Sequence, residues 1–176
     1  MSKYNFILVI FTGFLFSCAP TSEQAPTADV SEIDRNVDSL LALMTVDEKI
    51  GQMTQLTLDM LCYGDPYALS EPHTIDTAKL EVVINQLHVG SILNCGGHSY
   101  PREKWLDMIG DIQDKASKTR LGIPILYGID AIHGVTYTDS STLFPQQIGL
   151  AASWDTALVR QLAEMSAYEV RASGIR

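Results

Sequence analysis

"IPILYGIDAIHG" (residues 123–134) joins an apolar run to a carboxylate and an imidazole. Its first part, residues 123–130, is typical of a buried strand. Asp130 therefore lies at the end of the predicted strand, and His133 follows in the next loop. An aspartate at a strand end either caps a turn by bonding its own backbone or contributes to a binding pocket. The segment by itself leaves both interpretations open.

The surrounding chain alternates between predicted strands and helices. The sequence predicts a strand, a helix, a second strand and a second helix at residues 89–94, 101–117, 123–130 and 155–172. Apolar strands joined by crossover helices favour an α/β fold with a parallel sheet, either a barrel or a doubly wound sheet. The loop "NCGGHSY" (residues 94–100) has neither the GxGxxG pattern nor phosphate-loop spacing, so a nucleotide site is not predicted.

Polar side chains follow both predicted strands. In a parallel barrel the ligand site is built from the loops after the strands, so Asn94, His98, Asp130 and His133 are expected to share one rim. His133 either lines the pocket or holds its loop by bonding a carbonyl, and His98 has the same two readings. Neither histidine has zinc-ligand spacing to another ligand, so no metal, cofactor or catalytic role is assigned to them.

Glu169 is a second candidate carboxylate, because it lies on the apolar stripe of the helix at 155–172. Burial would raise its pKa, as an acid catalyst requires. A crossover helix, however, packs outside the barrel and away from the strand ends. We therefore expect Glu169 to have a structural role.

Two helices and a loop are predicted before the first strand–helix pair. Residues 31–44 have helical spacing, with Ile33, Val37 and Leu41 on a stripe expected to be buried. Thr45 and Glu48 form a capping-box pattern at the start of the next helix. Turn-forming residues at 63–74 predict a surface excursion, and a further helix is expected near 77–87.

The amino terminus has the pattern of an export signal. Residues 1–17 contain Lys3, an unbroken apolar core and then small residues, and the core is too short to span a membrane. The end "LFSC" resembles the lipobox of bacterial lipoproteins, which implies cleavage before Cys18 and a lipid on that cysteine. Residues 18–32 are expected to form a flexible tether. These features predict an exported protein of the periplasm or cell envelope that is attached to the membrane only through its lipid.

Composition limits the partners. The chain has 176 residues and a formal net charge of −9, without a cluster of Lys and Arg, which disfavours nucleic acid. A neutral ligand such as a sugar is compatible with this charge. Cys62 and Cys95 are too few for a disulfide framework and are expected to be buried thiols.

Four segments together resemble a known family. "LLALMTVDEKIGQMTQ", "IPILYGIDAIHG", "TLFPQQIGLAASWD" and "AYEVRASGI" occur in the order found in glycoside hydrolase family 3 enzymes of the β-glucosidase type, and the resemblance covers residues 33–176. It implies the amino-terminal part of a (β/α)8 barrel of the TIM type. It also implies that Asp130 binds hydroxyls of the terminal sugar. In this family the nucleophile and the acid/base come later in the chain, so no catalytic residue is assigned to residues 1–176.

The resemblance implies hydrolysis of terminal β-D-glucosyl residues with retention, with β-linked glucosides or oligosaccharides as partners. A typical barrel needs about 250 residues, so the chain is expected to be a front portion that is inactive alone. The alternative is a surface-tethered, non-catalytic carbohydrate-binding or vestigial protein. Within the family, β-xylosidase or another β-glycosidase activity stays open, and the N-acetylglucosaminidase branch is disfavoured by "GIDAIHG".

Overall fold

The computed structural model describes residues 30–66 and 73–175. Residues 1–29 lie outside this part, so Cys18, the predicted signal and most of the predicted tether are not described. Of the described residues, those from 30 to 40 belong to one unit and those from Leu41 onward to a second. Within the described residues, no helix has both the length and the apolar character needed to cross a membrane.

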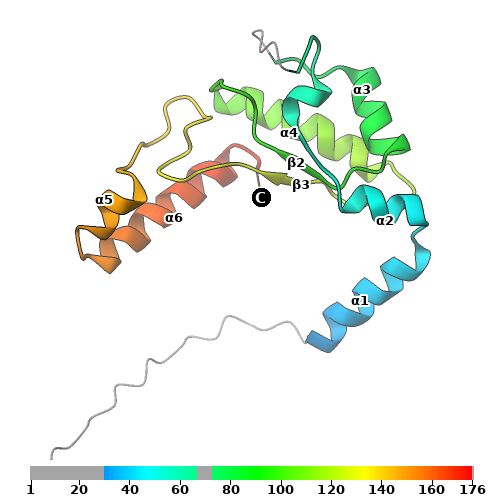
Figure 1. The fold of residues 1–176 in the computed structure, drawn as a ribbon, viewed down its shortest axis with the longest axis horizontal. Helices are drawn as coiled ribbons and strands as arrows, with labels where there is room; N and C mark the ends of the chain where they lie inside the picture. The colour runs from blue at the N-terminus through cyan, green and yellow to red at the C-terminus, as the bar shows by residue number, and fades with distance from the viewer. Residues whose placement is uncertain (1–29, 67–72, 176) are drawn as a thin grey trace, which may run out of the picture. The chain divides into compact units, whose positions relative to one another are not determined.

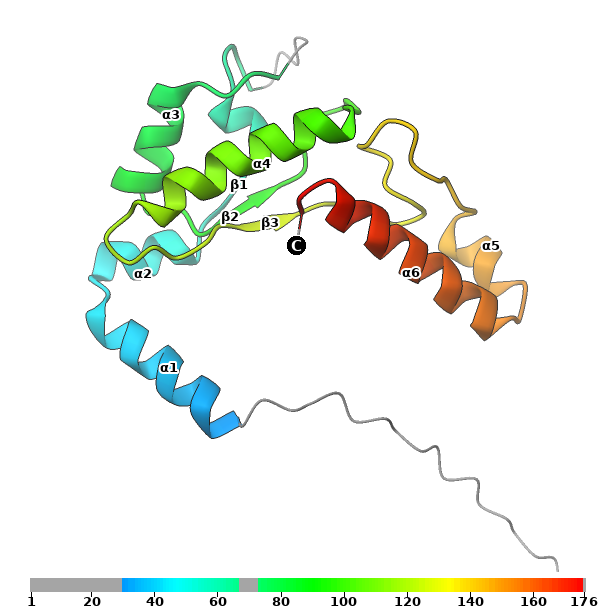
Figure 2. The ribbon, with the colours of Figure 1, turned by 180° about the vertical axis from the view of Figure 1, so that it is seen from behind.

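The second unit contains a parallel sheet of three short strands, as Figures 1 and 2 show. Strands β1 (Gln55–Thr57), β2 (Ser91–Leu93) and β3 (Leu126–Gly128) lie side by side in chain order. The register pairs Thr57 with Leu93 and Leu93 with Gly128, so all three carboxyl ends lie at one edge. This is the edge at which a barrel binds its ligand.

The sequence analysis missed β1 and overestimated the length of the other two strands. The three residues of β1 carry two exposed side chains, so they lack the apolar run that identifies a buried strand. Strand β3 begins after Pro124, which has no amide hydrogen to donate to a ladder. The sequential order β1-β2-β3 agrees with the predicted α/β fold of the TIM-barrel type.

Helix α1 (Val30–Leu43) forms where helical spacing predicted it, although it begins inside the segment assigned to the tether. Helix α2 (Val46–Gln52) has the predicted capping box, in which Thr45 Oγ1 accepts from the Glu48 N–H and a Glu48 oxygen accepts from the Thr45 N–H.

Helices between the strands pack against the sheet. The 3-10 helix η1 (Leu58–Leu61) follows β1, and α3 (Thr77–Glu81) continues into the π-helix η2 (Val82–Gln86) before β2. Helix α4 (Arg102–Ser117) connects β2 to β3 and is seen beside the sheet in both views (Figures 1 and 2). Its buried residues Trp105 and Ile112 share one core with Ile92 of β2 and Tyr127 of β3.

A long loop, residues 129–146, follows β3 and leads to two helices. The short helix α5 (Gln147–Ala151) was not predicted, whereas α6 (Thr156–Ala172) begins close to the predicted residue. The Asp155 carboxylate caps α6 by accepting from the Leu158 N–H at 2.9 Å. Ile175, just after α6, is buried in the same core as α4.

Candidate functional site

Asn94 and Asp130 form the centre of the candidate site at the carboxyl ends of β2 and β3. The register places these ends next to each other, and the two side chains meet there. Asn94 Nδ2 donates to Asp130 Oδ2 at 2.8 Å, and the Asp130 backbone N–H donates to Asn94 Oδ1 at 2.8 Å. Two of the four predicted rim residues are thus in direct contact.

The Asp130 carboxylate is exposed and only partly satisfied. Among the described residues, its one hydrogen-bond donor is Asn94 Nδ2, and Oδ1 accepts no hydrogen bond. The contact differs from the turn cap considered above, in which the side chain bonds its own backbone. An ionised carboxylate with a vacant oxygen can accept hydrogen bonds from a hydroxylated ligand.

Tyr137 is a candidate site residue that the sequence analysis missed. Burial raises the pKa of its phenol first, and the negative charge of Asp130 raises it further. A phenol is protonated at neutral pH even at its ordinary pKa of about 10, and the upward shift keeps it protonated, so this group can donate a hydrogen bond. The only signal in the sequence is an aromatic residue in the loop after β3, which is too common to predict a site.

His133 supports the loop that carries Asp130. Its Nδ1 lies 3.1 Å from the Phe144 carbonyl oxygen, and the Phe144 N–H donates to the His133 carbonyl at 2.8 Å. A carbonyl only accepts, so Nδ1 carries the hydrogen. Gly134 has φ +105°, and a Cβ there would lie 2.0 Å from the Thr142 carbonyl oxygen. The final glycine of "GIDAIHG" is thus needed for this loop to close on itself.

Glu169 anchors the same loop to α6. Its Oε1 accepts from Thr142 Oγ1 at 2.7 Å, and its two oxygens lie 3.2 and 3.1 Å from the Thr142 backbone nitrogen. These bonds use the carboxylate to hold a backbone segment in place. They agree with the structural role expected for Glu169.

The loop after β2 is held by a buried chain of polar groups. His73 Nε2 lies 2.5 Å from Asp59 Oδ1, and the Gly96 N–H donates to the same oxygen at 3.0 Å. The Tyr100 hydroxyl oxygen accepts from the His73 backbone N–H at 3.1 Å and also contacts His73 Nδ1. Since Asp59 accepts from Nε2–H, Nδ1 of a neutral His73 accepts from the tyrosine hydroxyl.

His98 lies in this cluster of rings. Its ring centroid is 5.0 Å from that of His73 and 6.1 Å from that of Tyr100. His73 is 5% accessible, whereas Tyr63, Gly64, Asp65 and Thr74 of the predicted surface excursion are exposed, and residues 67–72 lie outside the described part of the chain. Cys62 and Cys95 are buried thiols, as expected, and burial raises the pKa of Cys62 to about 11.

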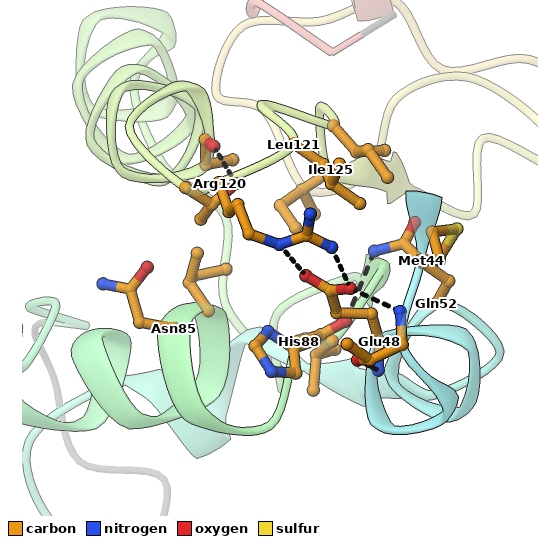
Figure 3. A pocket seen from close by; sticks show the side chains of 14 residues that line it. Met44, Glu48, Gln52, Asn85, His88, Arg120, Leu121 and Ile125 are labelled. Atoms are coloured by element: carbon orange, nitrogen blue, oxygen red, sulfur yellow. Dashed lines mark hydrogen bonds and ion pairs between the residues drawn. The ribbon is translucent and has the colours of Figure 1, made fainter. Parts of the chain in front are cut away.

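A separate cavity of about 260 Å³ opens at the opposite end of the sheet, beside the residues that precede β2 and β3 (Figure 3). Arg120 crosses it to the Glu48 carboxylate, with Nε to Oε1 at 3.0 Å and Nη2 to Oε2 at 2.5 Å. This bidentate pair holds the pKa of Glu48 at about 2. Both oxygens of Glu48 accept from Arg120, whereas Asn94 contacts only one oxygen of Asp130.

Within residues 30–66 and 73–175, three or more His, Cys, Asp or Glu side chains do not gather in a way that could hold an ion. The side-chain groups that meet at the carboxyl edge are the Asp130 carboxylate and the Asn94 amide.

Comparison with known proteins places this site in a family. Residues 45–176 match the glycosyl hydrolase family 3 N-terminal domain. The chain is 35% identical over 159 residues to the lysosomal beta glucosidase of Dictyostelium discoideum, covering 83% of the chain and 18% of that protein. It is 32% identical over 143 residues to the periplasmic beta-glucosidase of Salmonella typhimurium, covering 81% and 15%.

The chain is also similar to a solved structure of a beta-glucosidase. The beta-glucosidase of Listeria innocua in complex with isofagomine superimposes with a TM-score of 0.54 at 34% identity, over 81% of this chain and 17% of that one. The chain thus spans less than a fifth of the length of these three proteins. The family match extends over most of the chain, including the loops with Asn94 and Asp130, and the chain therefore belongs to glycoside hydrolase family 3.

Proposed function

We propose that the protein is a β-glucosidase-like exo-acting glycosidase and that Asp130 binds hydroxyl groups of the terminal sugar. The observation that carries this proposal is the exposed Asp130 carboxylate at the carboxyl end of the parallel sheet, where Asn94 Nδ2 donates to Oδ2 and leaves Oδ1 accessible. A pyranose presents adjacent hydroxyl donors. Hydrogen bonds from such donors to an ionised carboxylate contribute about 1.5 to 3 kcal/mol each.

Asp130 is proposed as a sugar-binding residue and not as the nucleophile. A retaining glycosidase uses two carboxyl groups about 5 to 5.5 Å apart across the scissile bond. The side chain that contacts the Asp130 carboxylate, at 2.8 Å, is the Asn94 amide and not a second carboxyl group. We therefore propose Asp130 as neither the nucleophile nor the acid/base. The similar proteins with the name beta-glucosidase favour glucosides as the substrate class.

The test is turnover of nitrophenyl glycosides by the full-length gene product. We expect release of nitrophenol from the β-D-glucoside above an empty-vector preparation, and retained β-configuration in the first product by NMR. Faster turnover of the β-D-xyloside would change the proposed substrate class from glucosides to xylosides and would not change the proposed role of Asp130. Binding of a β-glucoside without turnover of any glycoside would instead support a non-catalytic carbohydrate-binding protein.

The proposed cellular location is the periplasm or cell envelope, with a lipid on Cys18. Support comes from residues 1–18 of the sequence and from the periplasmic relative of Salmonella typhimurium. The Cys18→Ala variant of the full-length protein should move from the detergent phase to the aqueous phase on phase separation. Unchanged partitioning would contradict the lipid anchor.

A further inference from the structure

We propose that Asn94 is a positioning residue that fixes the Asp130 carboxylate for sugar binding. This inference rests on the proposed function of Asp130 and assigns a role to a second residue. Asn94 follows β2 directly, and its side chain reaches the end of the neighbouring strand. It contacts both the backbone and the side chain of Asp130.

The two contacts require the amide to have one orientation. Asn94 Oδ1 accepts from the Asp130 backbone N–H, while Asn94 Nδ2 donates to Asp130 Oδ2, both at 2.8 Å. A flipped amide would place a donor against a donor and an oxygen against the carboxylate. The pair therefore restrains the direction of the Asp130 carboxylate relative to its own backbone.

Asn94 is itself held in a special backbone conformation. Its φ of 49° lies in the left-handed region, which asparagine tolerates better than most residues other than glycine. Its N–H donates to the Gly128 carbonyl at 2.9 Å, and its carbonyl accepts from the Tyr127 hydroxyl at 2.8 Å. Tyr127 is 4% accessible, so this support comes from the core.

The consequence is a carboxylate ordered before the ligand arrives. Asn94 occupies one acceptor position on Oδ2 and leaves Oδ1 vacant among the described residues. Sugar binding then does not include the entropy cost of ordering the Asp130 side chain. The resulting increase in binding free energy is larger in the transition state, where the sugar must be positioned most precisely. Loss of Asn94 should reduce turnover through Asp130 while the sheet stays intact.

The test compares Asn94→Gly with His88→Gly in the full-length gene product. His88 precedes β2 at the other end of the strand, has φ 54° and is also half-buried, so it is a matched left-handed position away from the site. We expect Asn94→Gly to lower kcat/KM on the aryl β-glucoside about 10-fold, and His88→Gly to change it less than about twofold. Asn94→Asp keeps the size but lacks the donor and should lose at least as much as Asn94→Gly.

A double-mutant cycle separates positioning from a general structural effect. If Asn94 acts through Asp130, adding Asn94→Gly to Asp130→Ala should lower kcat/KM less than about twofold further. Two results would overturn the role of Asn94 and leave the role of Asp130 intact. One is an equal loss of kcat/KM on adding Asn94→Gly to wild type and to Asp130→Ala. The other is a normal kcat/KM for Asn94→Gly together with a reduced kcat/KM for Asp130→Ala. Unimpaired kcat/KM in Asp130→Ala would instead overturn the proposed function of Asp130, and the positioning role with it.

Discussion

Glu169 of α6 accepts hydrogen bonds from both the backbone N–H and the hydroxyl of Thr142 and so holds the loop that follows Asp130. This loop, residues 129–146, has few regular elements of its own. Its order therefore depends on contacts of this kind and on the close approach at Gly134. The carboxylate that the sequence offered as an acid catalyst serves the site indirectly, through the backbone.

Removal of the Glu169 carboxylate should destabilise the protein. Glu169→Ala leaves the Thr142 N–H and hydroxyl without their acceptor, and hydrogen bonds to a charged group contribute about 1.5 to 3 kcal/mol. We expect a lower Tm by calorimetry and more proteolysis within residues 129–146. Glu164→Ala is the control, since Glu164 is exposed on the same helix. An equal Tm for the two variants would contradict the anchoring role.

The ion pair in Figure 3 should make stability depend on pH in the acid range. The hydrogen bond from Arg120, and then that from the Thr45 N–H, lower the pKa of Glu48 from 4.5 to about 2. Because the folded value is lower than the unfolded one, the contribution to stability is complete above pH 4.5 and is lost as the pH falls toward 2.

Glu48→Gln should therefore lower Tm near neutral pH and have a smaller effect at about pH 3. The measured quantity is the difference in Tm between wild type and variant across this range. Glu103→Gln is the control, because it removes the same charge from a surface pair in which Glu103 is 70% accessible and Arg102 is 57% accessible. A difference that stays constant with pH would show that the Arg120 contact does not shift Glu48.

Tyr100→Phe tests the buried chain under the loop after β2. The change keeps the ring beside Trp105 but removes the oxygen that bonds the His73 backbone and Nδ1. Leaving buried polar groups unsatisfied should cost about 1 to 3 kcal/mol in the free energy of unfolding. Tyr63→Phe, at a side chain that is 62% accessible, should cost almost nothing. Equal midpoints in urea for both variants would contradict this role of Tyr100.

Local sequence patterns predicted strands β2 and β3, helices α1, α2, α4 and α6, and the edge at which Asn94 and Asp130 lie. The capping box at Thr45 and the apolar strands before these two residues depend on neighbours in the chain, and both are present. The direct contact between Asn94 and Asp130 follows from the pairing of β2 with β3. The sequence pattern predicted that both residues lie at the same edge of the sheet, but not that these two strands are neighbours.

The contacts of Asp59 and His73 could not be predicted in this way. Each is an isolated polar residue beside turn-forming sequence. They meet because residues 61–63 at the end of η1 pair with residues 74–76 through backbone hydrogen bonds. Strand β1 was missed for a related reason. Its three residues have no strand pattern of their own, and they form a strand because they pair with β2. Such long-range pairing overrides local preference.

Asp130→Ala in the full-length protein tests the sugar contact itself. If the carboxylate accepts two hydroxyl hydrogen bonds, their loss costs about 3 to 6 kcal/mol in transition-state binding, or roughly 10² to 10⁴ in kcat/KM. A monodeoxy glucoside that lacks a bound hydroxyl should react slowly with wild type and lose little more with Asp130→Ala, because the two changes remove the same contact. A merely structural aspartate would lower Tm and leave the ratio of rates on the two substrates unchanged. Near wild-type kcat/KM in a folded Asp130→Ala variant would show that "GIDAIHG" does not contact the sugar through its carboxylate.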